Sequence, residues 1–139
     1  MQIPIKVHTS PPLQAWGVTV LRVIIGLVFL VHGLQKLFGV MGGFGGPGQT
    51  APMATRYGAA GILEFFGGLL IIIGLFTRPV AAILVAEMIV AFFLGHVPRG
   101  GWPVENQGEL ALLYALIFML LAVRGGGAFS VDERLPWRL

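Results

Sequence analysis

Residues 18–38 read VTVLRVIIGLVFLVHGLQKLF, a predominantly apolar run with the length of a membrane-spanning helix. Three further stretches of similar character follow, at residues 58–76, 79–97 and 107–123. About 20 apolar residues in one helix cross the hydrocarbon core of a bilayer. The sequence therefore predicts an all-α fold, namely a polytopic transmembrane four-helix bundle in which residues 1–139 form a single domain.

The composition supports a membrane setting and excludes several other classes of protein. Hydrophobic residues make up 56% of the chain and charged residues only 11%, whereas a soluble domain carries roughly a quarter charged residues. The chain has no cysteine, which excludes disulfides, thiol catalysis and cysteine ligation of zinc or iron–sulfur clusters. The net charge of +3 does not indicate nucleic-acid binding, because the basic residues stand singly between apolar runs.

The connections between the predicted helices differ in length and in composition. Residues 39–57 are rich in glycine and proline, and we interpret them as a flexible outer loop or as a flap over the bundle. Phe76–Pro79 is expected to be a tight turn, with Pro79 at the first position of a new helix. The tail over residues 125–139 mixes charged and apolar side chains, so we expect it to lie along the membrane surface.

The distribution of basic residues predicts the orientation of the chain, because cytoplasmic loops carry an excess of Lys and Arg. The side that holds both termini carries the larger number: Lys6, Arg78, Arg124, Arg134 and Arg138, against Lys36, Arg56 and Arg99 on the other side. We therefore expect cytoplasmic N- and C-termini in a multi-pass protein of the cell inner (plasma) membrane. Its surroundings would be membrane lipids, other membrane or redox subunits, or further copies of the same chain.

Ionisable side chains inside the predicted spans are the candidate functional residues, because each of them is costly in lipid. The first and third helices run outward and the second and fourth run inward, so seven polar groups fall in the outer half of the bundle. Six of them form the predicted ligand-binding cluster: His32, Gln35, Lys36, Glu64, Glu105 and Glu109. The seventh, His96, is treated as secondary, since its helical phase is roughly opposite that of Glu87.

Some of these positions have structural as well as functional interpretations. Glu64 or Glu109 could form an ion pair with Lys36, and Lys36 and Glu105 could act as interfacial anchors. Glu64 shares a helix side with small residues, including Gly68, which would let a neighbouring helix approach closely.

Two ionisable residues lie away from the outer half of the bundle. Glu87 is near mid-membrane with no cation at its depth, so desolvation favours its protonated or hydrogen-bonded form and makes it a candidate proton relay. Arg22, in the inner half, is interpreted as a snorkelling or structural residue.

The sequence contains no motif for a nucleotide, a covalently bound cofactor or a hydrolytic triad. His32 and His96 lie on outward-running helices, so ligation of a haem by both is conceivable. We disfavour haem because His96 is close to a helix end and its phase is unhelpful. A metal site built from His32, Glu64 and Glu109 is possible, but nothing in the sequence requires it, so no metal is predicted.

The polar positions are embedded in segments that resemble the DoxX family over roughly residues 20–135. In residues 21–39 the pattern is His32-Gly33-x-x-Lys36, and in the second helix it is Glu64-x-x-Gly67-Gly68. Further similar segments are Gly74-Leu75-Phe76-Thr77-Arg78, Glu105 through Glu109, and Phe129-Ser130-Val131-Asp132. The resemblance implies a four-helix, multi-pass bacterial or archaeal membrane protein. It also implies that His32, Lys36, Glu64 and Glu109 are the positions shared with the family.

The resemblance further implies a redox setting, because relatives are named for the small membrane subunit of a thiosulfate:quinone oxidoreductase. Our first hypothesis is therefore a small subunit of an oxidoreductase system whose outer polar cluster binds a quinone head group. Phe65, Phe66 and Tyr114 could wall the ring, and the electrons would come from a partner, since the chain is not expected to catalyse alone. The alternatives are a non-catalytic membrane scaffold and a proton-coupled small-solute carrier with Glu87 as relay.

Overall fold

The computed structural model describes residues 13–136, and in this range all the regular structure is helical. The long helices are α1 (Leu13–Phe38), α2 (Arg56–Ile73), α3 (Thr77–Ala91) and α5 (Glu109–Arg124), whereas α4 (Pro103–Asn106) is a single turn. A π-helical turn, Phe92–His96, and a 3₁₀ turn, Val97–Arg99, extend α3, and a last 3₁₀ turn spans Asp132–Arg134. The predicted all-α class is confirmed.

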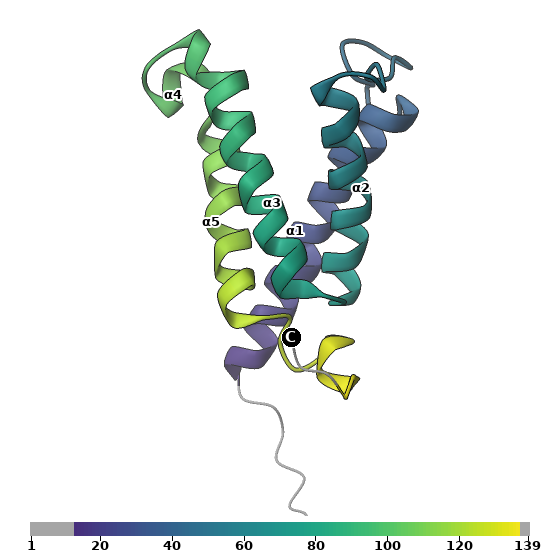
Figure 1. Cartoon of the computed structure of the whole chain (residues 1–139), viewed down its shortest axis with the longest axis vertical. Coiled ribbons are helices and arrows are strands. Elements are labelled where there is room, and N and C mark those ends of the chain that lie inside the picture. The colour runs from purple at the N-terminus through teal and green to yellow at the C-terminus, as the bar shows by residue number, and fades with distance from the viewer. Residues whose placement is uncertain (1–12, 137–139) are drawn as a thin grey trace, which may run out of the picture.

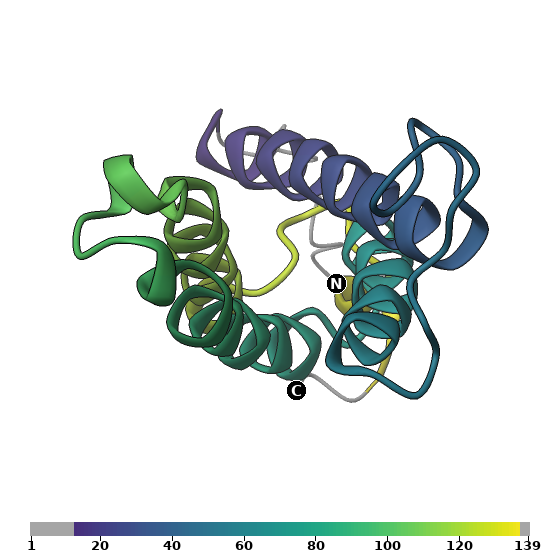
Figure 2. The same cartoon turned by 90° about the horizontal axis from the view of Figure 1, so that it is seen from above.

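The long helices form two antiparallel pairs, α1 with α2 and α3 with α5 (Figure 1). The pairs are joined by the α2–α3 turn at one end of the molecule and diverge toward the other end. We call the first the narrow end, where residues 125–134 also lie, and the second the wide end, which holds residues 39–55 and α4. Seen from above, α1 crosses from the α5 side of the molecule to the α2 side (Figure 2).

The predicted number of membrane-spanning helices is not matched by the structure. Three helical segments in the described range are long and apolar enough to cross a membrane: Leu13–Phe38, Arg56–Ile73 and Thr77–Arg99. The fourth, α5, has 16 residues and so rises roughly 24 Å, less than the hydrocarbon core of about 30 Å. The short α4 and the loop before α5 take up residues that a longer helix would need.

Local backbone chemistry sets helix boundaries that differ from the predicted ones by a few residues. α2 begins after Thr55, whose side chain accepts a hydrogen bond from Gly58 N, and it ends before Gly74, which has a φ of 70°. The α2–α3 turn therefore comes earlier than predicted. Pro79 consequently lies at the third residue of α3, and not at the first as we predicted.

The α1–α2 pair is held at close range by glycines on both helices. A Cβ at Gly33 would collide with the backbone of Phe65, and a Cβ at Gly68 would lie 2.8 Å from the nitrogen of Leu30. Small residues allow the helix backbones to approach, so van der Waals packing and short polar contacts can form between the helices. The expectation that the glycine side of α2 faces a neighbouring helix is confirmed.

Aromatic side chains form one of the contacts between the two helix pairs. Phe29 of α1 lies with its ring centroid 4.8 Å from that of Phe118 and 5.2 Å from that of Tyr114, both on α5. These three side chains are buried with Ile71 and Leu84. The core of the molecule therefore lies midway along the helices, directly below the region in which the pairs diverge.

The C-terminal segment packs against the helices at the narrow end. Its backbone runs against the α2–α3 turn, where Val131 N donates to Ile73 O and Asp132 N donates to Gly74 O. The Asp132 carboxylate accepts hydrogen bonds from Phe76 N and Thr77 N, at 2.7 and 2.8 Å. It therefore satisfies two free N–H groups at the start of α3. Lys6 and Arg138, which we count for the orientation of the chain, fall outside the described residues.

Arg22 joins α1 to the same region through the hydrogen bonds of its side chain. Its side chain is 2% exposed. The guanidinium donates through Nη1 to the carbonyl oxygens of Ile71 and Ile72, and through Nε to that of Gly126 at 2.8 Å. The charge therefore faces the carbonyl end of α2, which helix polarity makes favourable for a cation.

The close α1–α2 approach leads to a stability prediction. We expect Gly33→Ala to lower the free energy of unfolding by about 1–3 kcal/mol, because the added methyl group forces the helices apart. The matched control is Gly17→Ala on the same helix, where a Cβ meets no atom within 4 Å. This control should gain up to about 1 kcal/mol from helix propensity. Denaturant unfolding in detergent checks both, and equal effects of the two changes would contradict the packing.

Candidate functional site

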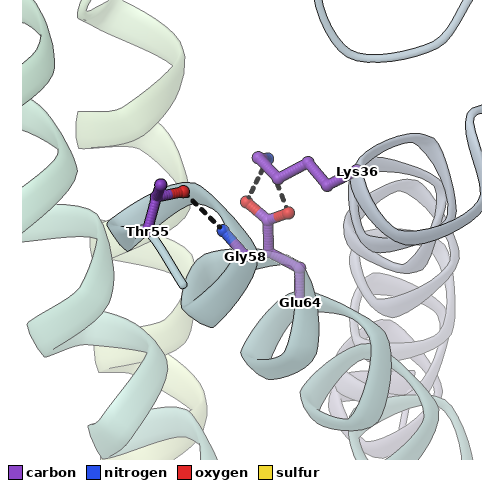
Figure 3. A network of polar contacts seen from close by, with 4 residues as sticks. All are labelled: Lys36, Thr55, Gly58 and Glu64. Carbon is purple, nitrogen blue, oxygen red and sulfur yellow. Dashed lines mark hydrogen bonds and ion pairs between the residues drawn. The ribbon is translucent and has the colours of Figure 1, made fainter. Parts of the chain in front are cut away.

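An ion pair between α1 and α2 is the best-defined polar contact near the wide end (Figure 3). Lys36 Nζ lies 2.7 Å from Glu64 Oε1 and 2.6 Å from Glu64 Oε2, so the ammonium bridges both carboxylate oxygens. The two side chains are 15% and 6% exposed. In such surroundings the pair is screened little by solvent, and neither partner can be removed without leaving a poorly solvated charge.

The packing of α1 against α2 brings Lys36 and Glu64 together. Lys36 is in the last turn of α1, and Glu64 is in the third turn of α2 on the side that carries the glycines. A Cβ at Gly61 would lie 3.0 Å from the Cβ of Lys36, which shows how closely the lysine stem passes over α2. The glycine at this position therefore makes room for the lysine to reach Glu64.

The second pair of helices contributes two buried polar groups without partners. Both carboxylate oxygens of Glu87 on α3, and the hydroxyl oxygen of Tyr114 on α5, are buried and have no hydrogen-bond partner within residues 13–136. Each group interacts electrostatically with Glu64 across the space between the helix pairs. Buried polar groups are normally paired, so these two are exceptions to the usual pattern.

His32 completes the arrangement from the side of α1. Its ring meets that of Tyr114 edge to face, with centroids 5.9 Å apart, and it interacts electrostatically with Lys36. Five residues from the four long helices therefore converge between the two pairs. We call them the interior polar cluster: His32, Lys36, Glu64, Glu87 and Tyr114.

The remaining residues of the predicted cluster lie elsewhere. Gln35 donates through Nε2 to the carbonyl oxygen of Met41 and so supports the start of the outer loop. Glu105 is exposed and accepts a bond from Trp102 N within the α4 turn. Glu109 is exposed at the first residue of α5. These three side chains sit near the wide end, as predicted, but not in the interior polar cluster.

The connections at the wide end are folded around backbone hydrogen bonds. In the loop over residues 39–55, Phe44 N donates to Gln49 O, and Ala51 N donates to the carbonyl oxygen of Lys36. The second bond connects the loop to the residue that carries the part-buried ammonium. His96, at the end of the π-helical turn, is 3.0 Å from Asn106 O through Nδ1, so it connects this turn to α4.

Sequence reasoning found the charged members of the interior polar cluster but assigned Tyr114 only as a wall for a ring. A hydroxyl-bearing aromatic residue within an apolar helix is a signal that could have been used, because a buried tyrosine hydroxyl normally finds a partner. Asp132 was noticed only as part of a family-like segment. Its capping role depends on a contact between residues far apart in the chain, which no local pattern reveals.

The ion pair gives a prediction that separates charge from packing. We expect Lys36→Met to destabilise the protein by about 3–5 kcal/mol, because the buried Glu64 carboxylate loses its partner. The double variant Lys36→Met with Glu64→Gln should recover most of this loss, since no lone charge remains. Denaturant unfolding of the single and double variants measures the difference. If the double variant is no more stable than Lys36→Met, the unpaired charge of Glu64 is not the cause of the loss of stability.

Comparison with known proteins gives a consistent result. The family model described as DoxX matches residues 17–97. An uncharacterized protein of Haemophilus influenzae is 40% identical over 82% of this chain and 87% of its own length. No solved structure matches the chain.

Two further relatives carry descriptive names. The inner membrane protein YqjF of Escherichia coli is 31% identical over 88% of this chain and 95% of its own length. A Bacillus subtilis protein named "Putative oxidoreductase CatD" is 34% identical, with 84% of each chain covered. The matched segment contains four members of the interior polar cluster, and Tyr114 lies beyond it.

Proposed function

Because the chain belongs to the DoxX family of membrane proteins, we propose that it is a small membrane subunit of an oxidoreductase system that binds a quinone head group in the interior polar cluster. The redox setting is supported by the name of the Bacillus subtilis relative. The choice of ligand is supported by the chemistry of the cluster. Its residues combine hydrogen-bond donors for a carbonyl oxygen with carboxyl groups that exchange protons.

The observation that carries the proposal is the pair of partnerless groups, Glu87 and Tyr114. Both are buried, both lie near the Lys36–Glu64 ion pair, and neither has a hydrogen bond within the described residues. A quinone carbonyl oxygen would accept a bond from the Tyr114 hydroxyl. The neighbouring carboxyl group of Glu87 would supply or receive the proton that accompanies each electron.

A shallow apolar furrow between α2 and α3 offers a route from the lipid to the cluster. It has a volume of about 150 Å³, and Ile62, Phe66 and Ile83 on its rim are exposed on the outer face of the helices. Gly67 and Leu84 also line it. These two residues lie one helical turn from Glu64 and Glu87 respectively, so the furrow would hold a prenyl chain beside the cluster.

The electrons come from a partner in this proposal. Reduction of a quinone to a quinol takes two electrons and two protons, and the residues of this chain can carry only the protons. Another redox subunit must deliver the electrons, and it would dock on this membrane subunit. The quinone would supply the redox chemistry, while Lys36, Tyr114 and Glu87 orient its head group and move its protons.

The proposal includes a topology. In the sequence, five basic residues belong to the side that holds both termini, against three on the other side, namely Lys36, Arg56 and Arg99. This bias favours a cytoplasmic narrow end with both termini on that side and a multi-pass chain. The name of the Escherichia coli relative supports the inner membrane as its location.

A second candidate function is favoured by the completeness of the Lys36–Glu64 pair. Glu64 is bridged through both of its oxygens, which is what a purely structural ion pair requires. In this case the protein is a membrane scaffold that positions a redox partner without binding a quinone itself.

Titration with a quinone distinguishes these two functions. We expect the purified protein in detergent to bind a short-chain quinone saturably, and Tyr114→Phe to weaken binding about tenfold, or about 1.4 kcal/mol. This change removes the hydroxyl group and leaves the ring in the core. The matched control is Glu109→Gln, an exposed carboxylate outside the cluster, which should bind like the wild type. Absence of saturable binding, or equal loss in both variants, would contradict the quinone site and favour the scaffold.

A further inference from the structure

A polar pocket at the narrow end lies apart from the interior polar cluster. It has a volume of about 170 Å³ and lies where the first turn of α3, the last turn of α5 and the C-terminal segment meet. Its lining residues are Arg78, Arg124, Gly125, Gly126, Ser130, Asp132 and Glu133. The pocket therefore combines two guanidinium groups with a glycine-rich backbone at the end of the apolar helices.

The two guanidinium groups in this pocket are not used by the fold. Neither Arg78 nor Arg124 forms a hydrogen bond or an ion pair with another residue in the range 13–136. Arg22, by contrast, donates its hydrogen bonds to backbone carbonyl oxygens. The stem of Arg78 lies over Gly125, where a Cβ would be 3.3 Å from its Nε. This contact fixes the direction of Arg78 without consuming its donors.

Two acidic residues, Asp132 and Glu133, also line the pocket and differ in their surroundings. Both oxygens of Asp132 accept hydrogen bonds from the backbone of Phe76 and Thr77. Its negative charge therefore interacts with the positive N-terminal end of α3. Glu133 also lines the pocket and is exposed. Because Arg forms bidentate bonds with phosphate oxygens, two such groups on adjacent helix ends suit a doubly coordinated anion.

The level of the pocket in the molecule suggests which anion reaches it. Arg78 is the second residue of α3, and Arg124 is the last residue of α5. Helix ends of apolar spans lie at the boundary between hydrocarbon and water, where the phosphate groups of lipids are found. Basic pockets between helices at this level are suited to anionic lipid head groups.

We propose that Arg78 and Arg124 form a site for a phosphate-bearing anion at the narrow end, in the first instance the head group of an anionic phospholipid. The site is independent of quinone binding, because none of its lining residues belongs to the interior polar cluster. An anionic lipid bound here would contact both Arg78 of α3 and Arg124 of α5, and so would link the ends of these helices. The contact lies beside the glycine-rich turn that connects α5 with the C-terminal segment.

Native mass spectrometry of the full chain released from detergent tests the site. Phosphatidylglycerol is titrated against phosphatidylcholine, which has a phosphate group but no net charge. We expect the wild type to prefer phosphatidylglycerol at least about tenfold, and Arg78→Gln with Arg124→Gln to abolish the preference. Arg99→Gln, an exposed arginine at the wide end, is the matched control and should keep it.

Two further arms identify the source of the anion and guard against misfolding. Inorganic phosphate at millimolar concentration is added as a competitor; if it displaces the lipid completely, the same site serves a soluble phosphate group. Replacing both arginines by lysine keeps the charge and should restore part of the preference, which a misfolded protein would not. Equal binding of the two lipids by the wild type, or equal loss of preference in Arg99→Gln, would overturn the proposal.

Discussion

The ion pair between Lys36 and Glu64 is the constraint on which the organisation of the wide end depends. It places one positive and one negative charge at 2.6 Å inside the protein, where each alone would be costly. Among the glycines of α1 and α2, Gly61 lies directly under the stem of Lys36 and leaves room for the ammonium to reach the carboxylate. Glu87, Tyr114 and His32 lie near this charge pair, and the carboxylate of Glu87 and the hydroxyl group of Tyr114 have no hydrogen-bond partner within the described residues.

The narrow end depends on other polar contacts, and these contacts join the two helix pairs there. Arg22 and Asp132 connect α1, the α2–α3 turn and the C-terminal segment through backbone groups. The helix pairs are therefore held together through backbone groups at the narrow end, whereas they diverge toward the wide end (Figure 1), where Arg56 Nη1 donates to Leu94 O.

Much of this architecture could be predicted from the sequence, because apolar length and charge placement are local properties. The spans at residues 18–38, 58–76 and 79–97 correspond to α1, α2 and the extended α3 within a few residues. The fourth was harder to predict, because Gln107 and Gly108 look compatible with a helix, although the chain folds into α4 and a turn before α5 begins. Placing Glu105 and Glu109 in the cluster was also unsupported by the contacts, since depth in the membrane does not determine which way a side chain near a helix end points. The positions of Tyr114 and Asp132 depend on long-range packing, which composition and spacing do not encode.

The central claim is that a quinone head group lies among Lys36, Glu87 and Tyr114, between the two helix pairs. Photo-crosslinking with an azido-quinone, followed by peptide mass spectrometry, tests this placement most directly. The account predicts labelling of the segments around Glu87 on α3 and Tyr114 on α5, suppressed by an excess of unlabelled quinone. Labelling confined to outward-facing residues of α1, such as Val20 and Ile24, and insensitive to the competitor, would contradict it.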